Sequence, residues 1–218
     1  MRGLWKHREV PATLSAHGSS AERLTTPRLS LAPLRAADLA EVHDIYADPG
    51  TWLHLPAGRH TELQQSALLV SDSERSWARS GLGRWSVRAR TALPGLPSGA
   101  LVGVVSATLL DCGVRNFGYR LTPAAWGIGL ATEAATAALA EARSSRFPVT
   151  ARALAGNPAS VRVLERIGLT RVWIGHGGGT PAVVPTGTGR PDTTALQRVI
   201  FADRPLAPDL LAAVIRLG

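Results

Sequence analysis

Lysine and cysteine are almost absent from this 218-residue sequence, and each absence excludes a class of site. Lys6 is the only lysine, so the chain has no Walker loop, whose Gly-Lys-Ser/Thr ending places a lysine on bound phosphates. Cys112 is the only cysteine, which rules out an internal disulfide, and no metal-ligand spacing surrounds it. We therefore expect neither a Walker site nor a bound metal.

Long hydrophobic runs are also missing. No stretch approaches the roughly 18 consecutive apolar residues of a membrane-spanning helix. The first residues lack the apolar core and the cleavage site of a secretory signal. For a chain of this length we expect one α/β domain with tails, located in the cytoplasm and away from membranes.

The formal net charge is +8, carried almost entirely by arginine. Such a charge suits nucleic-acid binding or an acidic or RNA-associated substrate, and it also arises from the arginine preference of a GC-rich genome. The arginines are scattered and form no basic run on a predicted helix. We therefore do not expect nucleic-acid binding.

The segment 121–135 predicts an anion-binding turn. Gly127 and Gly129 allow backbone conformations closed to other residues, so the amides of residues 126–132 can converge on one point. A helix predicted over about residues 132–143 adds the positive end of its dipole and its first, unbonded N–H groups. A pyrophosphate would fit this cradle.

Two other interpretations of the turn have to be weighed. A dinucleotide-binding fold has a third glycine where this chain has Thr132, and an acidic residue about 20 residues later, near where residues 144–146 read Ser-Ser-Arg. A turn that only caps a buried helix is the simpler alternative, because a lone glycine motif is a weak signal.

A second glycine-marked element begins at Gly156. Asn157 is a favoured N-cap, Pro158 suits the first helical position, and Gly168 suits the residue that ends a helix. The sequence therefore predicts a helix between Asn157 and Gly168, whatever its function.

Together the two elements resemble the GNAT superfamily of N-acetyltransferases. Residues 126–131, Trp-Gly-Ile-Gly-Leu-Ala, are similar to its coenzyme A signature, Gln/Arg-x-x-Gly-x-Gly/Ala, and the string through Ala134 is typical of the ribosomal-protein alanine N-acetyltransferase branch. In that branch an Asn-x-x-Ser element like Asn157 to Ser160 follows. The resemblance covers roughly residues 24–206. It implies an α/β fold with a mixed, mostly antiparallel central sheet that is flanked by helices and splayed at the acyl-CoA site.

Composition divides the chain further. Residues 1–22 mix Pro, Ser, Gly and His without periodicity and predict a disordered arm before the acetyltransferase domain of residues 23–206. Within that domain the glycine-rich residues 175–194 predict a mobile loop, and amphipathic spacing predicts a tail helix within 207–218. Hydrophobic periodicity predicts further helices over 36–46 and 61–80, and strands over 28–34, 84–90, 101–110, 116–121, 149–153, 170–174 and 197–202.

Roles in coenzyme binding follow from the same resemblance. The main chain of residues 119–121 is expected to pair with the pantetheine arm of acetyl-CoA, and residues 126–132 to bind its pyrophosphate. The full set expected to bind the coenzyme is Tyr119, Arg120, Leu121, Trp126, Gly127, Ile128, Gly129, Leu130, Ala131, Thr132, Asn157 and Ser160.

Acyl transfer from a thioester to an amine needs a neutral amine, a polarised carbonyl oxygen and help for the departing thiolate. Many superfamily members supply that help from a tyrosine, at a position that is Leu164 here. In the ribosomal-protein branch a serine lies near the sulfur, which implies this role for Ser160. The alternative is a serine hydroxyl bonded within the first turn of its own helix.

The proton acceptor is where the sequence departs from the family. Relatives often carry glutamate where this chain has Asn116, and an amide cannot accept the proton. A water, Asp111 on the preceding turn, Tyr119, or deprotonation in bulk solvent remain as alternatives, and alternation could instead place Tyr119 in the core. Without a protein base, the rate would follow the neutral fraction of the acceptor. This favours an α-amine, with a pKa of about 7.7 to 8.0, over a lysine at about 10.4.

We therefore expect an acetyl-CoA-dependent N-acetyltransferase that acts on a primary amine, with a protein N-terminus as the leading acceptor. An antibiotic or polyamine acceptor, and a catalytically silent acyl-CoA-binding regulatory module, are the alternatives. The partners are acetyl-CoA and the amine acceptor, with a homodimer left open.

Overall fold

The computed structural model describes residues 23–176 and 197–217. The arm predicted over residues 1–22, and the predicted loop from residue 177 onward, lie outside the described residues.

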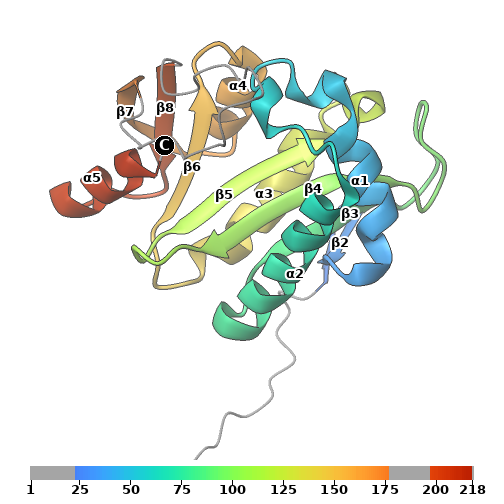
Figure 1. Cartoon of the computed structure of the whole chain (residues 1–218), viewed down its shortest axis with the longest axis horizontal. Helices are drawn as coiled ribbons and strands as arrows, with labels where there is room; N and C mark the ends of the chain where they lie inside the picture. Colours follow the sequence, from blue (N-terminus) through green and yellow to red (C-terminus); the bar gives the residue numbers. More distant parts are fainter. Residues whose placement is uncertain (1–22, 177–196, 218) are drawn as a thin grey trace, which may run out of the picture.

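Eight strands form one open sheet through the middle of the molecule (Figure 1). Their order is β1-β2-β3-β4-β5-β6-β8-β7, and every neighbouring pair is antiparallel except β5 and β6. The predicted mixed, mostly antiparallel sheet is therefore confirmed. The strands are β1 (Leu24–Thr25), β2 (Leu29–Pro33), β3 (Arg84–Ala89), β4 (Leu101–Leu109), β5 (Arg115–Leu121), β6 (Val149–Leu154), β7 (Thr170–His176) and β8 (Gln197–Ala202).

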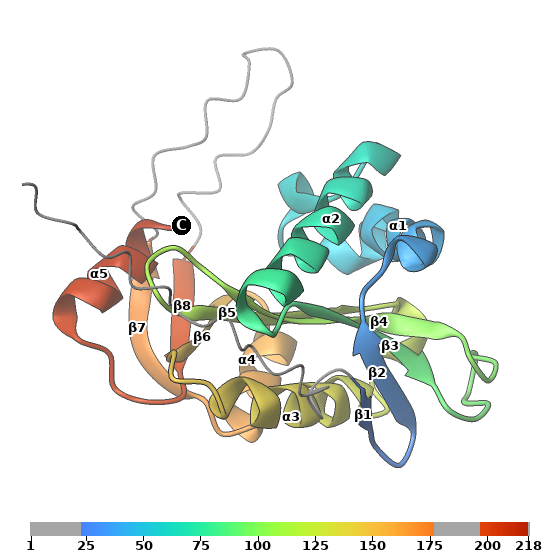
Figure 2. The ribbon, with the colours of Figure 1, turned by 90° about the horizontal axis from the view of Figure 1, so that it is seen from below.

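Helices cover both faces of the sheet (Figure 2). On one face lie α1 (Leu39–Ala47) and α2 (Leu63–Ser80), and on the other α3 (Leu130–Arg143) and α4 (Pro158–Arg166). The tail helix α5 (Pro208–Arg216) lies beside β7 and β8. None of these helices is long and apolar enough to cross a bilayer, within the part of the chain that the structure describes.

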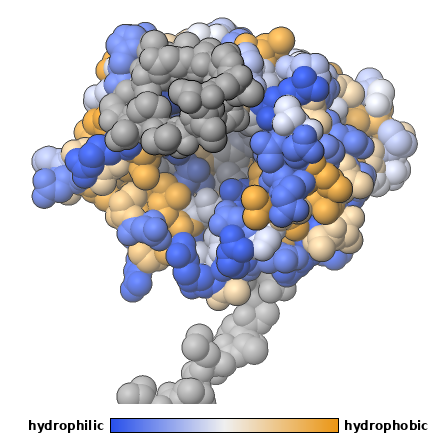
Figure 3. All heavy atoms as spheres, in the orientation of Figure 1, coloured by the Kyte–Doolittle hydropathy of each residue, from blue (hydrophilic) through white to orange (hydrophobic). Residues whose placement is uncertain are grey.

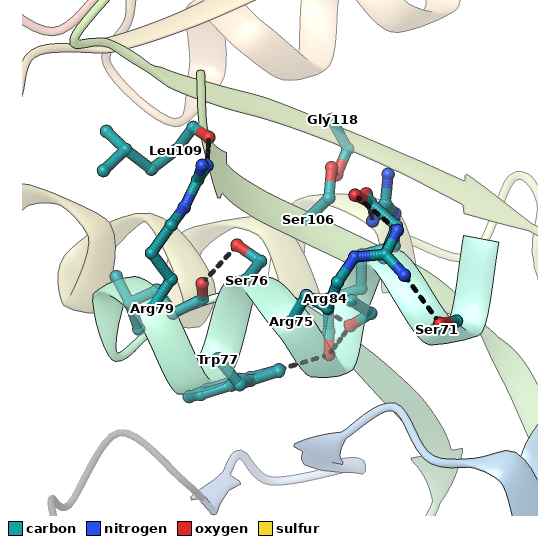
Figure 4. Close-up of polar contacts among 12 residues, drawn as sticks. Ser71, Arg75, Ser76, Trp77, Arg79, Arg84, Ser106, Leu109 and Gly118 are labelled. Atoms are coloured by element: carbon teal, nitrogen blue, oxygen red, sulfur yellow. Dashed lines mark hydrogen bonds and ion pairs between the residues drawn. The ribbon is translucent and has the colours of Figure 1, made fainter. Parts of the chain in front are cut away.

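Side chains of α2 fix this helix to the sheet. The indole of Trp77 donates to the main-chain oxygen of Arg84 at 2.9 Å, and the guanidinium of Arg79 donates to that of Leu109 at 2.8 Å (Figure 4). Because these bonds are made to main-chain groups of β3 and β4, α2 is held over the middle of the sheet.

Alternation along β4 and β5 divides the hydrophobic core between the two faces. Val105 and Phe117 are buried in the cluster that includes α3, whereas Val104 is buried in the cluster that includes α1. Val105 pairs with Tyr119 and Val104 with Arg120. Tyr119 therefore faces the α3 and α4 side of the sheet, and Arg120 faces the α1 and α2 side.

Most predicted elements are observed with boundaries shifted by one to three residues, and some of the differences have a clear physical reason. Helix α3 begins at Leu130, two residues early, because Gly129 takes the left-handed conformation (φ 83°) as its N-cap. Strand β7 extends through His176, since it pairs with β8 as far as Gln197. The short strand β1 was not predicted, because two residues are too few to show alternation.

The parallel pair β5 and β6 separates partway along its length. Paired residues are confined to Arg115–Phe117 on β5 and Val149–Ala151 on β6, yet β5 runs on to Leu121 and β6 to Leu154. This is the splay that the family resemblance implied.

Candidate active site

The splay opens onto a cleft of about 550 Å³. Its walls are the separated ends of β5 and β6, the first turns of α3 and α4, and a short 3₁₀ turn (Pro49–Trp52) with the loop after it. Segments far apart in the sequence therefore meet at the open end of β5, where the predicted binding residues were expected.

The predicted phosphate cradle has the expected backbone. Gly127 and Gly129 have φ values of 76° and 83°, a region that residues with a side chain rarely adopt. The N–H groups of residues 127–132 donate no hydrogen bond to any group of the described chain. These amides and the α3 dipole leave a place for an anion at the mouth of the cleft.

A charged network behind the cradle holds it in place. The guanidinium of Arg28 donates to the main-chain oxygen of Ile128 at 2.8 Å and to Glu133, in the first turn of α3, at 2.6 Å. The main-chain N–H of Arg28 and the hydroxyl of Thr26 also donate to Glu133, at 2.9 and 2.6 Å.

This network also sets the protonation of Glu133. Burial alone would raise the pKa of the Glu133 carboxyl, but the hydrogen bonds from Thr26 and Arg28 outweigh it and lower the pKa. Sequence reasoning missed the network, because its two sides lie more than 100 positions apart.

The main chain of Tyr119 faces the gap and has no partner among the described residues. In an antiparallel pair, every second residue exchanges main-chain hydrogen bonds with the neighbouring strand. The Leu110 N–H donates to the Val114 carbonyl and the Thr122 N–H to the Val102 carbonyl, so the even-numbered residues of β5 are the ones bonded to β4. Tyr119 therefore directs its N–H and C=O away from β4. The ladder to β6 ends at Phe117. A ligand in the splay can therefore pair with the Tyr119 main chain, as predicted for the pantetheine arm.

Helix α4 presents Asn157 and Ser160 to the same cleft. The Asn157 side-chain oxygen accepts the N–H of Ser160 at 3.1 Å, and Gly168 (φ 84°) follows the helix end, so both predicted caps are observed. The Asn157 amide nitrogen donates no hydrogen bond within the described part of the chain, so it can donate to a ligand. The Ser160 hydroxyl makes no hydrogen bond within the described chain. The alternative that this hydroxyl is bonded within the first turn of its own helix therefore has no support.

Tyr119 places its own hydroxyl beside Ser160. The hydroxyl donates to the main-chain oxygen of Ser160 at 3.2 Å, bridging β5 and α4 across the splay. Burial raises the pKa of Tyr119 to about 12. At neutral pH this phenol is protonated, so it is suited to donate a hydrogen bond rather than to accept the proton of an amine.

The structure does not bring Asp111 to the cleft. Asp111 lies in the β4–β5 turn, at the opposite end of β5, and its side chain is 99% exposed and 3.5 Å from Arg79. The run from Arg115 to Gly118 alone spans about 10 Å. Asp111 borders a different hollow, of about 680 Å³, whose other charged residues, Asp72, Arg75 and Arg79, pair among themselves and with it. Direct proton transfer from an amine held at the splay is therefore excluded for Asp111.

Asn116 is half-buried on the α1 and α2 face of β5, does not line the cleft, and makes no side-chain hydrogen bond within the described chain. Ile128 and Leu130 also point away from the cleft, and Leu130 is fully buried, so only their main-chain amides can reach a ligand. The remaining predicted residues do meet there: Tyr119, Arg120, Leu121, Trp126, Gly127, Gly129, Ala131, Thr132, Asn157 and Ser160.

The wall on the α1 side carries residues that the sequence did not indicate as a group. The Arg120 guanidinium lies over the Trp52 ring, with its carbon 3.3 Å from the ring centroid, and donates to the main-chain oxygen of Thr51. His54 also lines the cleft, whereas His60 is hydrogen-bonded to Ser66 at 2.8 Å and does not. Both histidines lie in the same loop, so the sequence did not indicate which of them would line the cleft.

Comparison with known proteins identifies the family. The model of the acetyltransferase (GNAT) domain matches residues 28–170, well over half of the chain. The chain belongs to this family. It is an N-acetyltransferase with acetyl-CoA as its acyl donor, and the family recognised in the sequence is confirmed.

Solved acetyltransferases share the fold. A putative GnaT-family acetyltransferase from Bordetella pertussis is 19% identical, with a TM-score of 0.63 over 84% of this chain and 99% of that chain. The enzyme from Salmonella typhimurium that modifies the N-terminal serine of ribosomal protein L7/L12 is 16% identical, with a TM-score of 0.61 over 84% and 97%. The microcin C7 self-immunity acetyltransferase, bound to acetyl-CoA and AMP, is 14% identical, with a TM-score of 0.59 over 81% and 92%.

Proposed function

We propose that this GNAT acetyltransferase transfers the acetyl group to the α-amine of a protein N-terminus. One observation carries the proposal: none of the described residues that line the cleft is an aspartate or a glutamate. Without a carboxylate to take the proton, the His54 imidazole is the one general-base candidate among the described lining residues, and transfer that does not use it depends on an acceptor that is already neutral near pH 7. An α-amine meets this condition far better than a lysine side chain, whose neutral fraction is smaller by over two powers of ten.

The donor fits the residues present. The amides of residues 127–132 would hold the pyrophosphate, the Tyr119 main chain and the Asn157 amide would hold the pantetheine arm, and the thioester supplies the acyl group. The Ser160 hydroxyl and the Tyr119 side chain both line the α4 side of the splay. Ser160 can donate to a developing thiolate directly, and Tyr119 can do so once its hydroxyl leaves the Ser160 carbonyl.

Small amines are the second candidate class. The microcin C7 self-immunity acetyltransferase, whose structure contains acetyl-CoA and AMP, has a similar fold. The cleft volume of about 550 Å³ would also hold a small molecule. The proposed function includes a cytoplasmic location and no nucleic-acid partner. It is compatible with a monomer or a homodimer.

The test is a thiol-release assay with acetyl-CoA and a panel of acceptors at pH 7.5. The panel contains peptides with a free α-amine, the same peptides with a blocked α-amine and a free lysine, a polyamine and an aminoglycoside. We expect turnover only where an α-amine is free. Turnover of the polyamine or the aminoglycoside, but of no peptide, would move the assignment to small amines. Coenzyme binding without turnover of any acceptor would overturn the proposal.

A further inference from the structure

Arg120 occupies the acceptor side of the splay. It shares a face of β5 with Gly118, two residues before it, while Tyr119 between them faces α4. Gly118 has no side chain, and a Cβ there would have only the Ser106 hydroxyl within 4 Å, at 3.6 Å. That hydroxyl donates to the Gly118 carbonyl at 3.3 Å (Figure 4). The sheet surface beside Arg120 is therefore open to an incoming acceptor.

The Arg120 side chain is held in one place. Its guanidinium carbon lies 3.3 Å from the centroid of Trp52 and 5.6 Å from that of Tyr46, and it donates to the carbonyl of Thr51. Stacking on aromatic rings leaves the edge of a guanidinium free to bind a planar anion. Because the group is already ordered, a ligand that binds it loses little additional conformational entropy.

No carboxylate neutralises Arg120 within the described chain. Other arginines have acidic partners: Arg28 pairs with Glu133 at 2.6 Å and Arg88 with Asp38 at 2.7 Å. Arg120 has only a carbonyl and aromatic faces, and burial lowers its pKa. A half-buried guanidinium without a counter-ion is costly, and an anionic ligand would remove much of that cost.

The coenzyme phosphates are not suited to be that anion. The cradle lies where α3 begins, on the opposite face of the sheet from Arg120. Arg152 of β6 also lines the cleft and lies on the acceptor face, since it pairs with Ile200 and alternates with the buried Ala151 and Ala153 of the other face. The surrounding face, which carries α1 and α2, mixes hydrophilic residues with hydrophobic patches (Figure 3). The Arg120 guanidinium thus lies on the face from which the acceptor enters.

We propose that the acceptor is an acidic N-terminus, and that Arg120 binds an aspartate or glutamate side chain within its first three residues. The inference rests on the proposed transfer to an α-amine. The Cα atoms of Gly118 and Arg120 are about 7 Å apart, the span of two extended residues. An amine held near Gly118 would therefore bring a carboxylate one or two residues later within reach of the guanidinium.

The first test uses the unaltered protein and three peptides that differ only at the second residue, Asp, Asn or Lys. We expect kcat/KM to be at least about tenfold higher for Asp than for Asn, the effect of one charge-assisted hydrogen bond, and lowest for Lys. Added salt should reduce the difference. Equal rates for the three peptides would overturn the acidic preference and leave transfer to an α-amine standing. Turnover of none of them would instead refute the proposed function.

The second test uses variants. Arg120→Gln should abolish the Asp-over-Asn preference, and Arg120→Glu should reverse it in favour of Lys. Arg75→Gln is the matched control, because it removes the same charge from the exposed face of α2, outside the cleft. Thermal unfolding checks that each variant is folded. If Arg120→Gln keeps the peptide preference but weakens coenzyme binding, Arg120 serves the coenzyme and the inference is wrong.

Discussion

Arg115 and Arg120 lie at opposite ends of β5. Arg115 lies at the end that is paired with β6, and Arg120 lies at the end where the two strands are splayed. Arg115, at the paired end, is 2% exposed and donates to the main-chain oxygens of Ser80 at 3.0 Å and Ala107 at 3.1 Å and to the Ser145 hydroxyl at 2.9 Å. Arg120, at the splayed end, donates to a single carbonyl and faces the cleft.

The comparison separates structural from functional charge. At the paired end the protein itself satisfies the guanidinium, so nothing remains for a ligand to bind. At the splayed end the ladder stops, and main-chain groups, the α3 amides and a guanidinium are left for ligands. Changes at the paired end should therefore alter stability, whereas changes at the splayed end should alter binding and catalysis.

The largest effect should come from Arg115→Met. The variant leaves the carbonyls of Ser80 and Ala107 buried without these donors, so the free energy of unfolding should fall by about 3 kcal/mol. Urea unfolding measures this loss. The folded fraction should bind coenzyme A as tightly as the unaltered protein, and weakened binding would break the separation of the two ends.

Gly129→Val should weaken coenzyme A binding by at least about tenfold, or about 1.4 kcal/mol, because valine strains the backbone at φ 83° and obstructs the cradle. Gly113→Val is the matched control: Gly113 has φ 85° and lies in the β4–β5 turn, away from the cleft. Calorimetric titration of both variants compares them. Equal affinity in a folded Gly129 variant would rule out the cradle.

Ser160→Ala and Tyr119→Phe sharpen the comparison within the splayed end. If either hydroxyl donates to the departing thiolate, its removal should lower kcat by about tenfold and leave the coenzyme dissociation constant nearly unchanged. Single-turnover assays alongside binding titrations separate the two quantities. A variant that keeps full turnover shows that its hydroxyl is structural.

The smallest effect should be the pH dependence of the network behind the cradle. The pKa of Glu133 is lowered from its ordinary value of 4.5, so its contribution to stability is complete above that value and is lost as pH falls through the folded-state pKa. Glu133→Gln should cost about 1 kcal/mol or less at pH 7 and nothing at pH 2, by urea unfolding. A cost that persists at pH 2 would point to packing rather than charge.

The parts of this site that the sequence predicted are encoded locally. The glycines at 127 and 129, the Asn157 cap and the apolar strands each depend on a few neighbouring residues, which is why the cradle, α4 and the sheet class could be read from the chain. The splay and the coenzyme roles came from family resemblance instead.

The contacts that the sequence did not predict join distant segments. Arg28 meets Glu133 across 105 positions, and Arg120 meets Thr51 across 69. The expectation that Asp111 could reach the cleft failed for the converse reason. Asp111 is close to Asn116 in sequence, but strand β5 carries the cleft away from it.

We propose above that the splayed end of β5 acetylates an α-amine and that no group of the enzyme takes its proton. The most direct test is the pH profile of kcat/KM for two acceptors, one with a free α-amine and one with only a lysine amine. His54→Gln tests the imidazole that lines the cleft, and Asp111→Asn and Asp192→Asn test two carboxylates, the latter outside the described residues. We expect the rising limb to track each acceptor's own pKa, about 7.7 to 8.0 and about 10.4, and to be unchanged in all three variants. A common limb near pH 5 to 7 for both acceptors, removed by one of the substitutions, would contradict the claim and identify an enzymic base.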